Sequence, residues 1–192
     1  MGMKIIGGCA RGVELADLAG QSGVRPTIGR SREALFNALG DLTGARVLDL
    51  FSGSGALGLE AASRGAAYVM LVESERARIP VIEANIAKVR KTGCTGDIVL
   101  KNCDATRPGD FLDGETFDLV FADPPYMESF AAFQKLASGS GDGLFPAFPG
   151  AVAIWELPDA PGSRGEFIGY LDEHGAVWRL RRFGGTDFLW IN

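Results

Sequence analysis

The apolar residues of the chain fall in short continuous runs, and stretches with helical spacing separate these runs. Five runs are apolar along most of their length, as in strands that helices cover on both faces of a parallel sheet. They span residues 46–51, 68–73, 97–105, 117–123 and 151–157. Helical patterns lie between them at residues 56–65, 75–93 and 128–138. This alternation predicts an α/β fold with a doubly wound, mostly parallel sheet.

Both ends of the chain depart from this repeat. Residues 3–16 alternate short apolar stretches with glycine, which predicts a small N-terminal β-hairpin. Residues 29–40 have helical spacing, and Gly40 is placed to cap that helix. Residues 175–192 indicate two strands joined near a Gly-Gly pair. We expect these two strands to form an antiparallel hairpin at the edge of the sheet.

Length and composition are those of a globular protein. The chain has 192 residues, of which 46% are apolar and 22% are charged. We expect an N-terminal β-hairpin extension over residues 1–27 and an α/β domain over residues 28–192. Pro80 should kink the helix of residues 75–93 unless it lies in the first turn. Because no apolar run approaches the roughly 18 residues of a membrane span and no signal peptide is apparent, we expect a soluble, cytoplasmic protein.

Cysteine and histidine usage limits the chemistry of the chain. Cys9, Cys94 and Cys103 form no CxxC pair, and His174, the single histidine, lies in a polar, turn-like stretch. This pattern offers neither a metal-binding cluster nor a histidine-based triad. We therefore expect no metal, three reduced cysteines and an exposed His174.

Charge is distributed unevenly along the chain. The net charge is −5. Residues 1–32 nevertheless carry five basic and two acidic side chains, and residues 175–192 carry three basic and one acidic side chain. Basic ends on an acidic body are compatible with a local footprint for a polyanion, although ordinary solvated charges would give the same pattern.

A glycine-rich turn follows the first of the apolar runs. Asp49 and Phe51 precede Gly53 and Gly55, where a strand meets a helix. Glycine lets the backbone turn tightly and approach a ligand, and the start of the helix offers free N–H groups. Together with Gly58 the glycines satisfy GxGxxG, so a nicotinamide-dependent oxidoreductase is an alternative. The order Asp-x-Phe-x-Gly-x-Gly instead resembles the first motif of class I S-adenosylmethionine methyltransferases.

Acidic residues also end the next two runs. Glu73 could accept hydrogen bonds from a ribose hydroxyl, and Asp104 could bind an adenine amino group. With Asp49 they place three acids at the carboxyl ends of three successive strands. This arrangement predicts one nucleoside in the crevice of the α/β sheet.

The fourth run ends in the sequence Asp123-Pro124-Pro125-Tyr126. The prolines have no N–H group, so this segment should form a pocket rich in hydrogen-bond acceptors, and Tyr126 offers a flat face for a base. Such a pocket suits an exocyclic amino group of a nucleobase, whose nitrogen is a poor nucleophile. Acceptors that hold its N–H bonds would stabilise the developing positive charge. Alternatively, the segment simply terminates a strand.

The motif resembles the Asp/Asn/Ser-Pro-Pro-aromatic signature of amino methyltransferases that act on adenine, cytosine or guanine. The surrounding stretches MKIIGGCARGVEL, VRPTIGRSREALFNAL, DLFSGSGALGLEAASRGA, VESE and FADPPY resemble, in this order, the RsmD family of bacterial 16S rRNA guanine-N2 methyltransferases. The resemblance implies a Rossmann-like, seven-stranded methyltransferase domain and S-adenosylmethionine as cofactor. It also implies a guanine substrate, nucleotide 966 in the family, within the small ribosomal subunit or its precursor. A monomer is expected.

The resemblance also implies roles for individual residues. The cofactor would be bound by Asp49, Phe51, Gly53, Gly55, Glu73, Ser74, Asp104 and Ala105. The target amine would lie at the catalytic residues Asp123, Pro124, Pro125 and Tyr126. RNA would be contacted by Lys4, Arg11, Arg25, Arg30 and Arg32, with Glu33 near the entrance, although surface ion pairs could also explain these arginines.

Other functions stay open at this point. A DNA or RNA adenine-N6 methyltransferase would use the same pocket, and a catalytically silent RNA-binding module would share the fold. The intact Asp-Pro-Pro-Tyr sequence argues against the silent module. A target base inside folded RNA must be splayed out to reach Tyr126.

Overall fold

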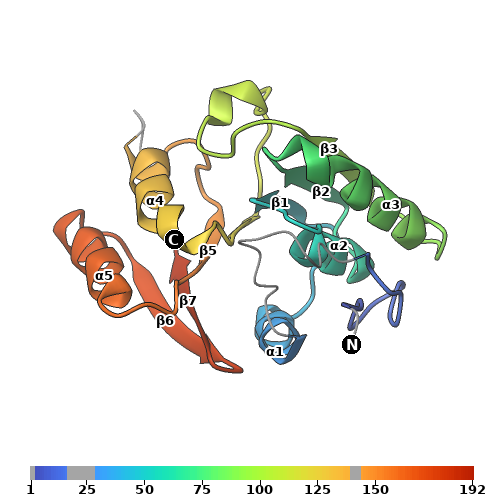
Figure 1. Ribbon diagram of the computed structural model, residues 1–192, viewed down its shortest axis with the longest axis horizontal. Coiled ribbons are helices and arrows are strands. Elements are labelled where there is room, and N and C mark those ends of the chain that lie inside the picture. Colours follow the sequence, from blue (N-terminus) through green and yellow to red (C-terminus); the bar gives the residue numbers. More distant parts are fainter. Residues whose placement is uncertain (1–2, 17–28, 139–143) are drawn as a thin grey trace.

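A seven-stranded mixed sheet forms the centre of the protein, with helices on both faces (Figure 1). The computed structural model describes residues 3–16, 29–138 and 144–192. The strand order is β3-β2-β1-β4-β5-β7-β6. The strands are β1 (Arg46–Leu50), β2 (Tyr68–Val72), β3 (Asp97–Lys101), β4 (Leu119–Ala122), β5 (Val152–Glu156), β6 (Trp178–Phe183) and β7 (Thr186–Ile191). β1 to β5 are parallel, whereas β7 pairs antiparallel with both β5 and β6. The predicted doubly wound sheet with an antiparallel C-terminal hairpin is confirmed.

Five α-helices accompany the sheet among the described residues. They are α1 (Gly29–Leu39), α2 (Ala56–Ser63), α3 (Ile79–Arg90), α4 (Ser129–Ala137) and α5 (Ser163–Glu173), with short 3-10 turns η1 (Arg76–Arg78), η2 (Pro108–Asp110) and η3 (Tyr126–Glu128). The sequence did not reveal α5, which buries only Phe167 and Leu171 and contains two glycines. Pro80 lies in the first turn of α3, where its missing N–H is harmless. His174 is exposed at the end of α5, as expected.

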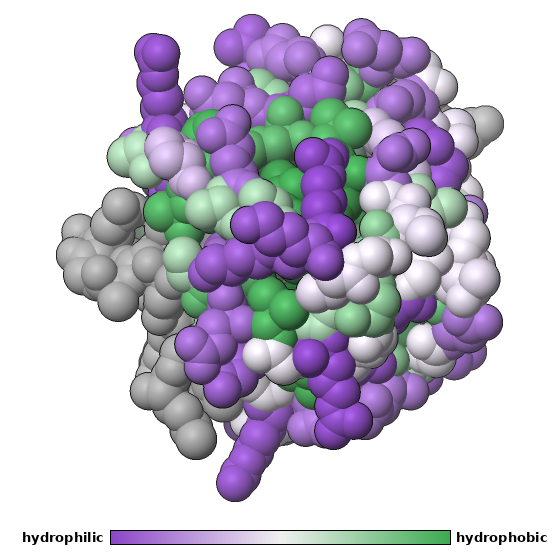
Figure 2. Space-filling model, turned by 90° about the vertical axis from the view of Figure 1, so that its right-hand side faces the viewer, coloured by the Kyte–Doolittle hydropathy of each residue, from purple (hydrophilic) through white to green (hydrophobic). Residues whose placement is uncertain are grey.

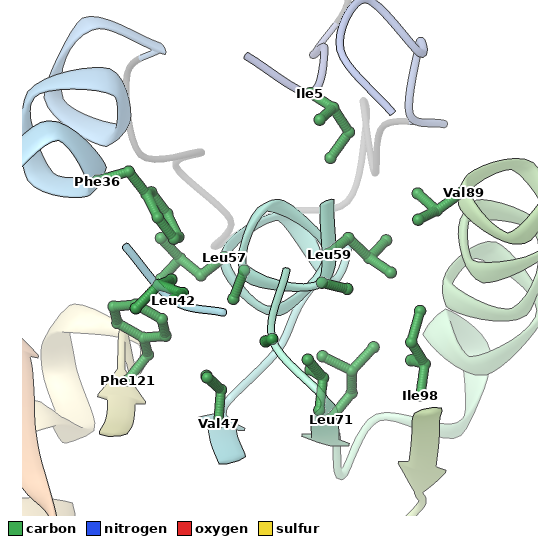
Figure 3. Close-up of a cluster of buried hydrophobic side chains, with 14 of the residues drawn as sticks. Ile5, Phe36, Leu42, Val47, Leu57, Leu59, Leu71, Val89, Ile98 and Phe121 are labelled. Carbon is green, nitrogen blue, oxygen red and sulfur yellow. The ribbon is translucent and has the colours of Figure 1, made fainter. Parts of the chain in front are cut away.

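Alternate strand residues supply two separate hydrophobic cores. One core, shown in Figure 3, packs Val47, Leu71 and Phe121 of the sheet against α2, which contributes Leu57 and Leu59. It also includes residues from α1, α3 and the N-terminal segment. On the other face, strand residues such as Leu48 pack with the aromatic residues of α4 and α5. The two-residue period of each strand therefore builds the three layers.

The N-terminal segment, residues 3–16, is fastened to α2 through a buried acid. Lys4 and Glu14 form an isolated antiparallel bridge. The N–H groups of Ile6 and Gly7 each donate to the Glu60 carboxylate at 2.8 Å. Glu60 is fully buried and also pairs with Arg64 at 2.8 Å. The predicted hairpin is therefore a single bridge joined by turns, and its contacts with α2 hold it in place.

Cys9 and Cys94 form a disulfide, with Cα atoms 5.7 Å apart. The prediction of three reduced cysteines is wrong for these two; Cys103 is free. The pair was missed because it is 85 residues apart in sequence. Only the folding of residues 3–16 across α2 brings Cys9 to the loop after α3.

The strand predicted over residues 97–105 is shorter than expected. β3 ends at Lys101, after which the Asn102 side-chain amide donates to the backbone carbonyls of Glu73 and Ser74.

Figure 2 shows the face on the α3 side, where hydrophilic residues predominate and apolar ones lie between them. Among the described residues, none of the helices is both long and apolar enough to cross a membrane.

Candidate active site

A cleft of about 770 Å³ lies at the carboxyl ends of the parallel strands. It brings together most of the residues predicted to bind cofactor and target, although they come from four different strand ends. Its lining includes Asp49, Phe51, Gly53, Glu73, Ser74, Asp104, Ala105, Asp123, Pro124, Pro125 and Tyr126. Gly55 does not line the cleft but precedes α2 as its N-cap. Such a crevice is the usual ligand site of open α/β sheets.

The turn after β1 carries an unusual backbone conformation. Phe51 has φ 59°, the one positive φ at a non-glycine position among the described residues, and Gly53 and Gly55 follow with φ 57° and 81°. Positive φ is costly for a bulky side chain, and such strain clusters at ligand sites. The Phe51 ring lies edge-on to Trp155, with ring centroids 6.3 Å apart. The turn is therefore held in a shape that glycine alone adopts freely.

Asp49 holds this turn from beneath. Its side chain is 1% exposed, and its Oδ2 accepts a hydrogen bond of 2.8 Å from the Gly58 N–H in α2. The pKa of the Asp49 carboxyl is raised to about 8, mainly by burial. The Gly58 hydrogen bond opposes this shift, and the nearby acids Asp123 and Glu73 add to it. The geometry makes Asp49 a positioning residue for the start of α2.

Gly58, the third glycine of the GxGxxG match, is required by the packing of α2. A Cβ atom built at Gly58 would come within 2.2 Å of Leu71 Cδ2 and 3.1 Å of Asp49 Oδ2. The third glycine therefore lets α2 lie close against β1 and β2, a packing need that does not depend on a nicotinamide cofactor.

Glu73 links the end of β2 to the glycine turn. Its Oε2 accepts from the Gly53 N–H at 2.8 Å, and its Oε1 accepts from the Glu75 N–H at 2.8 Å. Arg78 lies 3.6 Å from the same carboxylate. A carboxylate has about four acceptor positions, so two neutral donors leave capacity for a ligand hydroxyl. Sequence reasoning missed Arg78 and Asn102, whose partners become visible only in the fold.

Asp104 lies in the turn after β3. Its Oδ1 accepts from the N–H of Thr106 at 2.9 Å and from the Thr106 hydroxyl at 2.8 Å. Burial alone would raise the pKa of Asp104, but these hydrogen bonds and the charges of Lys135 and Arg107 hold it below its ordinary value. Lys135 of α4 reaches the Thr106 hydroxyl at 3.2 Å and also lines the cleft. Asp104 is thus kept as an anionic acceptor.

The Asp-Pro-Pro-Tyr segment leaves the sheet directly after β4. The Pro125 carbonyl accepts from the Glu128 N–H at 2.9 Å, which closes the η3 turn. Within the described part of the chain, no turn or loop N–H donates to the Pro124 carbonyl. Tyr126 is 37% exposed. The segment therefore offers the Asp123 carboxylate and one backbone carbonyl beside an accessible ring.

α4 anchors this segment to the neighbouring strand. Trp155 of β5 donates from Nε1 to Ser129 Oγ at 3.0 Å, and both residues are buried. Ser129 begins α4, three residues after Tyr126. Because the turn is pinned at both ends, the motif is preorganised.

The predicted RNA-contacting residues occupy different environments. Lys4 is exposed and pairs with Glu14 at 2.9 Å, and Arg11 and Arg30 are also exposed. Arg25 lies outside the described residues. Arg32 is 2% exposed and donates to the Lys4 carbonyl from a position beside Glu60. Burial lowers the pKa of Arg32 in spite of Glu60. Its position favours a structural role, and an RNA contact by Arg32 stays a prediction.

Comparison with known proteins places these features in a family. The family described as "Conserved hypothetical protein 95" matches residues 3–140. Ribosomal RNA small subunit methyltransferase D of Escherichia coli K12 is 41% identical over 127 residues, which cover 65% of this chain and 60% of that protein. The chain thus matches about three fifths of the length of this relative.

Solved structures agree with the fold. A hypothetical protein of Thermus thermophilus superposes with a TM-score of 0.68 at 28% identity, covering 99% of both chains. Aeropyrum pernix fibrillarin with natively bound S-adenosyl-L-methionine superposes with a TM-score of 0.59 over 78% of this chain and 67% of that one. At 16% identity the fibrillarin match is one of fold alone.

Proposed function

The chain belongs to the RsmD family, and we propose that it methylates the exocyclic N2 amine of a guanine in bacterial 16S rRNA. The methyl donor is S-adenosyl-L-methionine, and the substrate is the small ribosomal subunit or its precursor. The observation that carries the proposal is one continuous cleft shared by the glycine turn and the Asp-Pro-Pro-Tyr segment. A cofactor site and an amine site in one cleft are what direct transfer requires.

The donor set in the cleft fits the proposed cofactor. At Gly53, with φ 57°, the nearest atom to the place a Cβ would occupy is the Phe51 carbonyl oxygen at 3.9 Å, so a ligand can approach the backbone closely. Glu73 has acceptor capacity for ribose hydroxyls, and Asp104 can accept from an adenine amino group. Bound S-adenosylmethionine supplies an electrophilic methyl group on a sulfonium centre. The acids that line the cleft also favour binding of a cation.

The target amine would be held at the end of β4. Asp123 and the Pro124 carbonyl each accept a hydrogen bond from one of its N–H groups, and this directs the nitrogen lone pair into the cleft. These acceptors gain strength as the amine becomes positively charged, so they stabilise the transition state more than the ground state. The amine proton leaves to Asp123 or to water. Tyr126 supports the base by stacking.

The assignment of guanine in rRNA rests on the family. The acceptors in the cleft suit an amino group on any of three bases, whereas the E. coli relative is named a small subunit rRNA methyltransferase. RNA contacts would come from exposed basic residues such as Arg11 and Arg30, whose positive charges attract the RNA phosphates. The rest of the molecule is acidic, so binding should depend on shape and local charge.

A direct test supplies radiolabelled S-adenosylmethionine together with naked 16S rRNA, unmodified small-subunit particles or duplex DNA. The modified nucleoside is then identified by mass spectrometry. We expect N2-methylguanosine, formed with rRNA or particles and absent with DNA. N6-methyladenosine as the product would overturn the guanine assignment, and product on DNA alone would overturn the RNA assignment.

A further inference from the structure

A second, smaller cleft of about 320 Å³ adjoins the active site. It lies between the end of β5, the start of α5 and the turn of the β6–β7 hairpin, and Tyr126 is the residue that lines both clefts. Its volume is at the lower end of the range of ligand pockets. A ring stacked on Tyr126 could therefore have its reactive edge in the larger cleft and its remaining polar edge in the smaller one.

We propose that the smaller cleft receives the target base and that Glu156 is the residue that selects guanine over adenine. This inference rests on the proposed function, because it concerns the substrate of the same site. It adds a base-reading side chain outside the Asp-Pro-Pro-Tyr segment. The position of Glu156 and the hydrogen-bond donors of the two purines support this role.

Strand register places Glu156 next to the catalytic segment. β4 and β5 run parallel, and their last registered pair is Ala122 with Trp155. Asp123 directly follows β4 and Glu156 is the last residue of β5, so the two carboxylates lie at the ends of adjacent strands, at the same edge of the sheet. Glu156 lines the smaller cleft and is 6% exposed.

The backbone around Glu156 is held firmly. Glu156 is in register with Phe188 of β7, and the Leu157 N–H donates to the Asp187 carbonyl at 2.9 Å. A side chain on a central strand between two paired neighbours is a precise platform for recognition. Glu156 is therefore better suited to reading a base than a residue on a free loop.

The other charged groups of the smaller cleft are more exposed than Glu156. Asp187 has 17% of its side chain exposed. Arg164 and Arg182 have about half or more of their side chains exposed, and Asp159 is exposed. Glu156 is thus the buried carboxylate of this cleft. The two arginines are placed for phosphates that flank the base.

Purine chemistry supplies the selection. The pairing edge of guanine carries two adjacent donors, the N1–H and the N2 amine, and both match a carboxylate. The pairing edge of adenine carries the N6 amine beside N1, which is an acceptor and would face the carboxylate unfavourably. A site built to accept a hydrogen bond discriminates strongly against a partner that lacks the donor. Glu156 can accept from N1–H while Asp123 and Pro124 hold the N2 amine.

The Glu156→Gln substitution tests this arrangement because an amide presents one acceptor and one donor, which match the N6–H and N1 of adenine. Small-subunit particles carrying guanine or adenine at the target position are methylated with wild-type and variant enzyme. We expect kcat/KM for guanine to fall by up to about tenfold, because the amide oxygen replaces a charge-assisted hydrogen bond to N1–H with a weaker neutral one. The ratio of guanine to adenine product should fall as well. Glu166→Gln, an exposed carboxylate-to-amide change on α5, should leave both values unchanged.

A second arm uses the wild-type enzyme, so it does not depend on the folding of a variant. With 1-methylguanine at the target position, which lacks the N1–H, we expect methylation to be slower by about tenfold or more. Glu156→Ala should recover part of that rate because it removes the acceptor and frees space. Equal wild-type rates on guanine and 1-methylguanine would overturn the inference. So would an unchanged purine preference in a folded Glu156→Gln enzyme that binds S-adenosylmethionine normally.

Different results would contradict the proposed function and the selection of guanine by Glu156. If the wild-type enzyme forms no N2-methylguanosine on any RNA, the proposed function itself is wrong. If it forms N2-methylguanosine but neither Glu156 nor the N1–H affects the rate, only the selection by Glu156 is wrong.

Discussion

The Asp49 carboxylate accepts a hydrogen bond of 2.8 Å from the Gly58 N–H while both residues are buried beneath the cleft. The pair joins the end of β1 to the first turn of α2. It fixes the helix whose N-terminus lines the cleft. It also makes the fold sensitive to the protonation of one carboxyl.

The pH dependence of stability should reveal this carboxyl. The pKa of Asp49 is raised from 3.8 to about 8 in the folded protein, so the native state holds the proton more tightly than the unfolded state. The stabilising effect of this bound proton is complete below about pH 4 and is lost as the pH rises through about 8. Over that range the free energy of unfolding falls by at most about 1.4 kcal/mol per pH unit. Urea unfolding should show Asp49→Asn gaining free energy of unfolding relative to wild type between about pH 5 and 8. A constant difference across that range would contradict the raised pKa.

The close approach of α2 to the sheet predicts the effect of a single methyl group. Gly58→Ala should lower the free energy of unfolding by about 1–3 kcal/mol, because Leu71 and Val69 must shift within a packed core. Gly169→Ala in α5 is the matched control, since a Cβ there meets no atom within 4 Å. The control should gain up to about 1 kcal/mol. Thermal and urea unfolding measure both, and equal effects would argue against the packing explanation.

The disulfide should contribute to stability through the unfolded chain. Opening the Cys9–Cys94 bond should cost about 2–4 kcal/mol, because it closes a long loop. Cys9→Ser should reproduce the effect of a reducing agent on the wild-type protein, and the reducing agent should not affect the variant further. A wild-type protein as stable when reduced as when oxidised would show that the contacts of Glu60 suffice.

A substitution in the catalytic segment should affect methyl transfer and not cofactor binding. Asp123→Ala should slow methyl transfer at least about tenfold, corresponding to a charged hydrogen bond of about 1.5–3 kcal/mol. Cofactor affinity, measured by calorimetry, should be largely kept, because Glu73 and Asp104 lie at other strand ends. Normal turnover in Asp123→Ala would remove Asp123 from the mechanism.

Exposed basic residues predict the salt dependence of RNA binding. If Arg11 contacts a phosphate, Arg11→Ala should weaken binding and reduce the slope of log affinity against log salt by roughly 0.7–0.9. Arg179→Ala, at an exposed position of the edge strand β6, serves as a charge-matched control. Identical slopes for wild type and Arg11→Ala would place the RNA elsewhere.

The sequence predicted those parts of the molecule that depend on local pattern. Continuous apolar runs ending in Glu73 and Asp123 indicate buried parallel strands, and parallel strands bring their carboxyl ends to one edge. The cleft could therefore be predicted from strand ends alone. α5 was missed because it buries only two side chains and carries glycines at 165 and 169.

Features that depend on distant segments could not be predicted in this way. The burial of Arg32 and the role of Glu60 follow from how residues 3–16 and α1 lie against α2. The disulfide depends on the same placement. The register that brings Glu156 beside Asp123 depends on β5 pairing with β4, which no short stretch of sequence specifies.

The attachment of the N-terminal segment to Glu60 determines which partner adapts on binding. Two backbone amides of the segment donate to a fully buried carboxylate, so the segment cannot lift away without removing two hydrogen bonds from a charge inside the protein. Its shape is therefore settled before any partner arrives, and little ordering entropy remains to be lost there. An RNA that docks on this surface must bend to fit a rigid template.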